Sequence, residues 1–141
     1  MIKRNIYTII AEISYLFLIC FFCYTAVNKL MNLESFRTNL IKTSLFSEEI
    51  AKYFSVLVIV TEIIVILLMI FYKKTGLLFL SFMILIFTFY ISFLNFKGLY
   101  EVCGCGGILN GLSYKYHFII NISLCFCAIY SFVIFNTKAH E

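Results

Sequence analysis

Residues Leu77 to Phe96 read LLFLSFMILIFTFYISFLNF, twenty positions without a charged side chain. A helix of about 20 apolar residues crosses a bilayer core of about 30 Å, whereas a helix on a soluble protein keeps one polar face. This stretch therefore predicts a transmembrane helix and sets the class of the whole chain.

The composition extends this interpretation to the rest of the molecule. Of 141 residues, 63% are hydrophobic and 13% are charged, and the mean hydropathy is +1.02. A single domain of this size cannot bury so much apolar surface, so lipid is the expected solvent for most of it. The net charge of +4 does not indicate nucleic-acid binding, because the basic residues lie mostly between apolar runs and form no stripe.

Three more apolar runs accompany the central one, so we expect an all-α, integral membrane four-helix bundle forming one domain over residues 1–141. The four spans are predicted at about 6–30, 53–72, 77–96 and 117–135. The first run is too long for the apolar region of a signal peptide and lacks a small-residue cleavage site, so it should remain in the mature protein. The sequence Lys73-Lys74-Thr75-Gly76 predicts a tight basic turn between the second and third spans.

The segment from Met31 to Lys52, between the first two spans, is more polar but has its own pattern. Its apolar residues recur at roughly helical spacing: Leu33, Phe36, Leu40, Ile41, Leu45 and Ile50. We expect an amphipathic helix in the membrane interface or over the mouth of the bundle, and a solvated connector is the alternative. Ser47-Glu48-Glu49 predicts an N-cap with acidic residues in the first turn of the next helix.

Four spans place both termini on the same side of the membrane. Basic residues are densest at the termini and in the turn between spans two and three: Lys3, Arg4, Lys73, Lys74 and Lys138. The positive-inside rule then predicts cytoplasmic termini in the inner (cytoplasmic) membrane. The loop between the third and fourth spans would face the exterior, where disulfides persist.

That loop contains Cys103-Gly104-Cys105-Gly106-Gly107, the candidate active site. Two thiols one residue apart close only a small ring, so their disulfide should be strained and should exchange readily with a partner dithiol. A permanent structural disulfide that only holds the loop is one alternative. A zinc or copper(I) site formed with His117 is another, but no fourth ligand is evident and we assign no metal ligands.

His117 and Asn121 are four residues apart, hence on one face of the fourth span just beneath the loop. An imidazole there could favour the reactive thiolate or accept its proton, and a histidine bonded only to backbone is the alternative. Two further cysteine pairs, Cys20 with Cys23 and Cys125 with Cys127, lie inside spans. They are either small hydrophobic residues or a redox relay, which would require spans one and four to touch.

Carboxylates within the spans cost about 3 kcal/mol each near a helix centre, so Glu12 and Glu62 should face the interior and be paired or protonated. Glu12, Cys20 and Cys23 share one side of the first span, which we expect to face protein. No basic residue is expected at the depth of Glu62. We therefore weigh a proton-handling or quinone-contacting role for Glu62 against a hydrogen bond across helices.

Several of these residues resemble the MauE branch of the DoxX-like membrane proteins. The resemblance covers nearly the whole chain and is sharpest from Cys103 to Asn121. The residues that carry it are Tyr24-Thr25-Ala26, Lys29, Glu62, Cys103-Gly104-Cys105-Gly106-Gly107, Leu112-Ser113, His117 and Asn121. It implies a four-helix membrane bundle in thiol-disulfide chemistry, in MauE's case alongside a thioredoxin-like partner during maturation of methylamine dehydrogenase. It does not imply that this organism uses methylamine.

The first hypothesis is thus a membrane protein that exchanges disulfides with an extracytoplasmic thioredoxin-like partner through Cys103 and Cys105. An alternative is a quinone-coupled oxidoreductase with Glu62 and the inner cysteines near the quinone. A third is a metal-handling or structural subunit. No cofactor is assigned under the first hypothesis.

Overall fold

The computed structural model describes residues 6–100, 109 and 111–137, and these residues form helices and short connections without strands. The helices are α1 (Ile6–Met31), α2 (Leu33–Lys42), α3 (Glu48–Phe71), α4 (Lys73–Phe96) and α5 (Tyr114–Thr137). The predicted all-α class is therefore confirmed.

Four of the five helices, α1, α3, α4 and α5, are long and apolar enough to cross a membrane. Each has 24 to 26 residues, a length of about 36 Å at about 1.5 Å per residue. The four predicted spans all correspond to one of these helices, although α3 begins five residues earlier than the predicted span. The earlier start follows from Ser47, whose hydroxyl accepts a hydrogen bond from the Ile50 backbone N–H at 3.4 Å and caps the helix as predicted.

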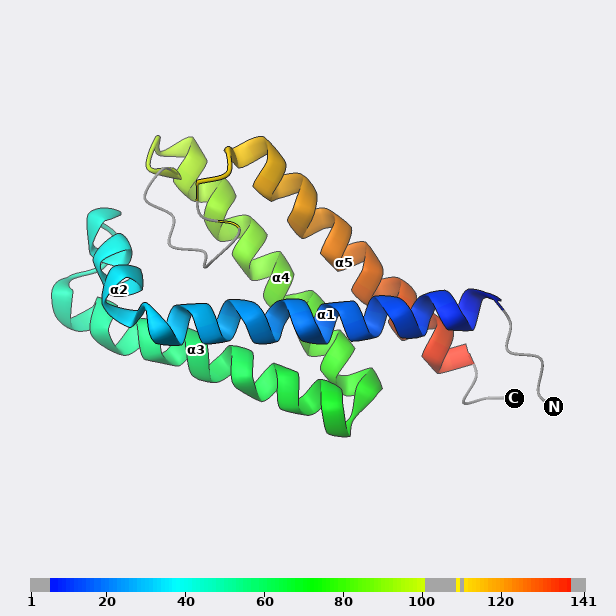
Figure 1. The fold of residues 1–141 in the computed structure, drawn as a ribbon. Helices are drawn as coiled ribbons and strands as arrows, with labels where there is room; N and C mark the ends of the chain where they lie inside the picture. Colours follow the sequence, from blue (N-terminus) through cyan, green and yellow to red (C-terminus); the bar gives the residue numbers. More distant parts are fainter. Residues whose placement is uncertain (1–5, 101–108, 110, 138–141) are drawn as a thin grey trace.

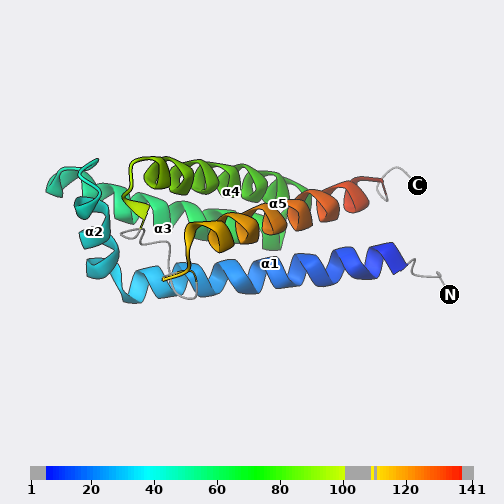
Figure 2. The same ribbon diagram turned by 90° about the horizontal axis from the view of Figure 1, so that it is seen from above.

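The helices pack so that α4 lies between α3 and α5, while α1 contacts both α3 and α5. The start of α1 and the end of α5 lie at one end of the bundle (Figure 1). The short helix α2 and the connection from α4 to α5 lie at the opposite end, as the perpendicular view also shows (Figure 2). The start of α1 and the end of α5 thus share one side, and the end of α4 and the start of α5 lie on the other.

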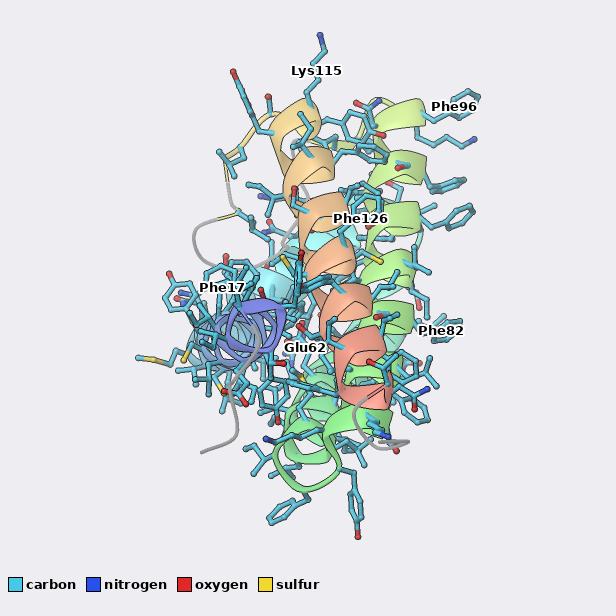
Figure 3. All side chains as sticks on the ribbon, turned by 90° about the vertical axis from the view of Figure 1, so that its right-hand side faces the viewer. Phe17, Glu62, Phe82, Phe96, Lys115 and Phe126 are labelled. Atoms are coloured by element: carbon cyan, nitrogen blue, oxygen red, sulfur yellow. The ribbon has the colours of Figure 1, made fainter. Side chains whose placement is uncertain are left out.

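The surface of the bundle is apolar, as expected for contact with lipid tails. Phe17, Phe82, Phe96 and Phe126 project away from the helix axes (Figure 3) and are all more than half exposed. The interior between the long helices holds smaller and aliphatic side chains, including Leu18 and Leu80, both fully buried. A soluble protein would expose few of these phenylalanines, so the bundle fits a bilayer rather than water.

Helix α2 is the amphipathic element predicted between the first two spans, shortened to Leu33–Lys42. Its Phe36 and Leu40 are buried against Ala51 and Ile59 of α3, and its other face carries polar residues. The helix stops because Ser44 takes a left-handed backbone conformation with φ of 56°. It therefore covers one flank of the bundle at the end where α4 stops and α5 begins.

The predicted turn at Lys73 to Gly76 is wrong, because these residues form the first turn of α4. The connection is Tyr72 alone, between the end of α3 at Phe71 and the start of α4 at Lys73. The glycine serves another purpose: a Cβ at position 76 would lie 2.3 Å from the backbone nitrogen of Met69. Gly76 is needed for the close approach of two helices and not for a turn conformation.

Gly76→Ala should lower the free energy of unfolding by about 1–3 kcal/mol, because an added methyl group must push the α3 backbone away. Thermal unfolding in detergent, followed by circular dichroism, measures the change. Thr75→Ala is the matched control, since Thr75 is exposed on the same turn. Equal stability of the two variants would contradict the close approach of α3 and α4.

Candidate functional site

A cavity of about 140 Å³ lies at the end of the bundle that carries α2 and the connection from α4 to α5. Aromatic and aliphatic side chains from all five helices form most of its wall, among them Phe36 of α2 and Phe87 of α4. Five polar residues also line it: Thr25, Lys29, Glu62, His117 and Asn121. These polar residues come from α1, α3 and α5, so the fold brings together positions separated by up to 96 residues.

Lys29 and Glu62 form a buried ion pair across the cavity wall. The Lys29 ammonium donates to Oε1 of Glu62, and the two side chains are only 5% and 0% exposed. Nζ of Lys29 also lies 5.5 Å from the centroid of the Phe87 ring, a cation–π distance. The second carboxylate oxygen, Oε2 of Glu62, is buried without a hydrogen-bond partner among the described residues.

This ion pair corrects the expectation that no basic residue reaches the depth of Glu62. Lys29 lies near the end of α1, but its four-carbon stem lets the ammonium extend inward instead of towards the interface. This inward extension of the lysine side chain is favourable, because an unpaired carboxylate inside a bilayer is costly in free energy and a nearby cation offsets that cost. Glu62 is thus paired with Lys29. The two opposite charges of this pair join α1 to α3 at the cavity.

His117 is 2% exposed and is held by a tyrosine that the sequence analysis did not single out. The Tyr100 hydroxyl lies 2.9 Å from Nδ1 of His117 and donates to the backbone oxygen of Leu112, also at 2.9 Å. The alternative of a histidine bonded only to backbone is therefore wrong for this side chain. The sequence offers one signal that could have pointed to Tyr100 as a site residue: it is the last tyrosine before the two loop cysteines.

The Tyr100 hydroxyl sits in a small aromatic cluster at the start of α5. Its ring meets the Tyr114 ring edge-on at 5.6 Å, and the Tyr114 hydroxyl lies 3.1 Å from the Ser92 hydroxyl on α4. Burial raises the pKa of Tyr100 above the ordinary tyrosine value, so its hydroxyl keeps its proton at neutral pH. The cluster fixes the start of α5 against α4, directly beside His117.

Asn121 and Thr25 complete the polar part of the cavity wall. Asn121 is buried on the same face of α5 as His117, one turn further along, as the four-residue spacing predicted. Thr25 is buried on α1 and donates its hydroxyl to the Phe22 backbone oxygen at 3.1 Å. The two residues add an amide and a hydroxyl to the cation, carboxylate and imidazole already present.

Cys103 and Cys105 lie outside the described residues, so their predicted role stays a prediction. The described residues on either side of them do bear on it. Tyr100 precedes the pair and Leu112 follows it, and the hydrogen bond between these two closes the connection. Leu109 is buried and lines the cavity. Tyr100, before the cysteine segment, therefore lies beside His117, and Leu109, after the two cysteines, lies in the cavity wall.

The other four cysteines are free thiols distributed away from the cavity. Cys125 is buried in the main apolar core, Cys23 and Cys127 pack against that core, and Cys20 is exposed. Helices α1 and α5 do contact each other, as a relay would require. Among the described residues, however, no cysteine lines the cavity.

The face of α1 predicted to point inward is wrong for Cys20. The buried face of α1 is formed by small, aromatic and aliphatic residues that include Ala11, Leu18 and Phe22, whereas Glu12 and Cys23 are half-buried at its border. The prediction grouped the polar residues, but close helix packing is achieved by small and well-fitting side chains. Cys20 consequently faces the lipid side.

No group of three or more His, Cys, Asp or Glu side chains suited to a metal ion occurs within the described part of the chain. The metal alternative involves Cys103 and Cys105, which this finding does not cover. Among the described residues that line the cavity, His117 and Glu62 are of types that bind metal ions, and Glu62 already pairs with Lys29.

A comparison with protein families matches residues 7–134 to the model of the family described as "Methylamine utilisation protein MauE". The match covers all four long helices and every polar residue of the cavity. No curated protein matches the chain. No solved structure matches it.

Proposed function

Because this chain belongs to the MauE family of methylamine utilisation proteins, we propose that it is a multi-pass membrane protein whose Cys103 and Cys105 exchange disulfides with an extracytoplasmic thioredoxin-like partner. The observation that carries the proposal is that described residues on either side of the cysteine segment meet the polar cavity or its histidine. Tyr100 bonds to His117 and to the Leu112 backbone oxygen, and Leu109 lines the cavity.

The exchange needs no external oxidant or reductant beyond the partner. A thiolate of the reduced pair attacks one sulfur of the partner's disulfide, and the partner's other sulfur leaves as a thiolate. The second thiol of the pair then attacks the mixed disulfide, which gives an oxidised pair and a reduced partner. Two electrons and two protons pass from one dithiol to the other, and the reverse direction follows the same steps.

The cavity residues would support this exchange in two ways. His117 is the buried base nearest the described flanks of the cysteine segment, so it would hold the proton that a thiol releases. The Lys29 and Glu62 pair binds α1 to α3 and so fixes the part of the cavity wall that these two helices form. Neither role requires the membrane-embedded cysteines.

Sealed vesicles of defined orientation test both the exchange and the proposed topology of cytoplasmic termini in the inner membrane. Pre-reduced vesicles are mixed with an oxidised thioredoxin-like protein, and its new thiols are counted by mass after alkylation. Right-side-out vesicles should reduce the added protein, whereas inverted vesicles should not. Reduction only by inverted vesicles would reverse the topology, and reduction by neither would contradict the exchange. Vesicles with the Cys103→Ser, Cys105→Ser double variant provide the background rate.

A second candidate function, quinone-coupled oxidation, is favoured by one observation. The cavity has aromatic walls and a buried carboxylate oxygen, Oε2 of Glu62, without a described partner. A quinol hydroxyl could donate to that oxygen, and the ring would occupy the apolar part. Protein purified in mild detergent should show a quinone absorption band that disappears on reduction if this function holds. Absence of any extractable quinone, with exchange activity intact, would leave disulfide exchange alone.

A further inference from the structure

We propose that Tyr100 is a positioning residue that fixes the tautomer of His117, so that Nδ1 carries the proton and Nε2 is the basic nitrogen facing the cavity. This inference deepens the proposed function, because it names the atom that would accept a thiol proton. It rests on two hydrogen bonds of a single hydroxyl, the burial of the imidazole and the position of the cavity.

The tautomer follows from counting protons. A tyrosine hydroxyl has one hydrogen, and a backbone carbonyl can only accept. The Tyr100 hydroxyl must therefore donate to the Leu112 oxygen, 2.9 Å away. Its second contact, Nδ1 of His117 at 2.9 Å, must then be the donor, and the hydroxyl oxygen accepts from it. In a neutral imidazole this leaves Nε2 without a hydrogen.

The ring is neutral because of its surroundings. His117 is 2% exposed, and a buried imidazolium would need a counter-charge. The charged or titratable groups that line the same cavity are Lys29 of α1, Glu62 of α3 and Tyr90 of α4. Lys29 and Glu62 already pair with each other, so the carboxylate is not left to balance a second cation. On α5 itself, the Tyr114 ring meets the Tyr100 ring edge-on.

The orientation of the ring sets where the basic nitrogen lies. His117 lines the cavity but Tyr100 does not, so Nδ1 faces the aromatic cluster and the opposite edge of the ring faces the cavity. The same hydroxyl also joins the residue before the cysteine segment to the residue after it. One hydroxyl thus bonds to both Leu112 and His117. The partner of one imidazole nitrogen decides which nitrogen is left to accept a proton.

Nitrogen NMR of histidine-labelled protein tests the tautomer independently of any exchange activity. The chain has two histidines, so His140→Gln leaves His117 as the single labelled imidazole. We expect a protonated Nδ1 and an unprotonated Nε2 in the parent, and loss of this pattern in Tyr100→Phe. A protonated Nε2 in the parent, or an unchanged spectrum in Tyr100→Phe, would overturn the proposal.

The consequence for the thiols is tested by the pH dependence of their alkylation in a variant that keeps only Cys103 and Cys105. Near neutral pH, Tyr100→Phe should slow alkylation about a hundredfold, the lower end of the range that a positioned base contributes. His117→Gln should slow it similarly, and the double variant should be no slower than His117→Gln, because Tyr100 acts through His117. Tyr116→Phe, which removes a hydroxyl from an exposed tyrosine of the same helix, should leave the rate unchanged.

The outcomes separate this inference from the proposed function. If the double variant is slower than His117→Gln by a further tenfold, Tyr100 acts on the thiols by another route and the positioning role is wrong. If the tautomer and alkylation results hold while no exchange with a thioredoxin-like protein occurs, the proposed function fails and the assignment of Nε2 as the basic nitrogen stands.

Discussion

Lys29→Met should lower the free energy of unfolding by about 3–5 kcal/mol, the range for removing one partner of a buried ion pair. Methionine keeps the apolar stem against Phe87 but leaves the Glu62 carboxylate, which is fully buried, without its cation. Glu62→Gln should also destabilise the bundle, because it leaves the ammonium unpaired. Unfolding in mixed detergent micelles, followed by circular dichroism, measures both changes.

The double variant Lys29→Met, Glu62→Met provides the control. It removes both charges, so the desolvation cost disappears together with the attraction, and stability should return to within about 1 kcal/mol of the parent. Parental stability in Lys29→Met alone would mean that the contact between Lys29 and Glu62 contributes nothing to holding α1 against α3.

The long helices could be predicted from sequence because lipid imposes one strong requirement. Every backbone polar group inside a bilayer must be paired, so each apolar run of sufficient length has to be a helix. Residues 77–96 fall within α4, and the 24 residues of α3 include nearly all of the second predicted span. The same argument located α2 through the periodic spacing of Phe36 and Leu40.

The pairing of side chains could not be predicted, because it depends on distances between helices. The positions of Lys29 and Glu62 along their helices do not give the reach of the lysine stem, on which their pairing depends. Tyr100 follows no periodic pattern, and its importance arises only when the chain folds back to place it against His117. The predicted inward face of α1 is wrong for Cys20 because polar residues do not by themselves mark the interior of a membrane bundle.

Replacing both Cys103 and Cys105 by serine should abolish disulfide exchange with the partner. Serine keeps the size and polarity of each side chain but cannot form a disulfide, so the first step of the exchange is lost. The vesicle assay with an oxidised thioredoxin-like protein measures the rate, which should fall to the uncatalysed background. The helices, whose content circular dichroism reports, should stay intact, since the pair falls in the sequence between α4 and α5.

The matched control replaces the other four cysteines, Cys20, Cys23, Cys125 and Cys127, by alanine. These thiols lie away from the cavity, so exchange with the partner should continue at close to the parental rate. If this quadruple variant loses exchange while it remains folded, electrons must pass through the membrane-embedded thiols and the relay hypothesis is required.

The most direct test of disulfide exchange by the loop cysteines is to trap the mixed disulfide in single-cysteine variants. Removal of the resolving thiol leaves the covalent complex with the partner intact. Cys105 is nearer in sequence to the helix that carries His117, so Cys105 is the expected attacking thiol and Cys103→Ser the variant that traps. Non-reducing electrophoresis should show a heavier band with Cys103→Ser, a weaker one with Cys105→Ser, and neither band after reduction. Absence of the band from both variants, while both remain folded, would contradict thiol-disulfide exchange at this loop.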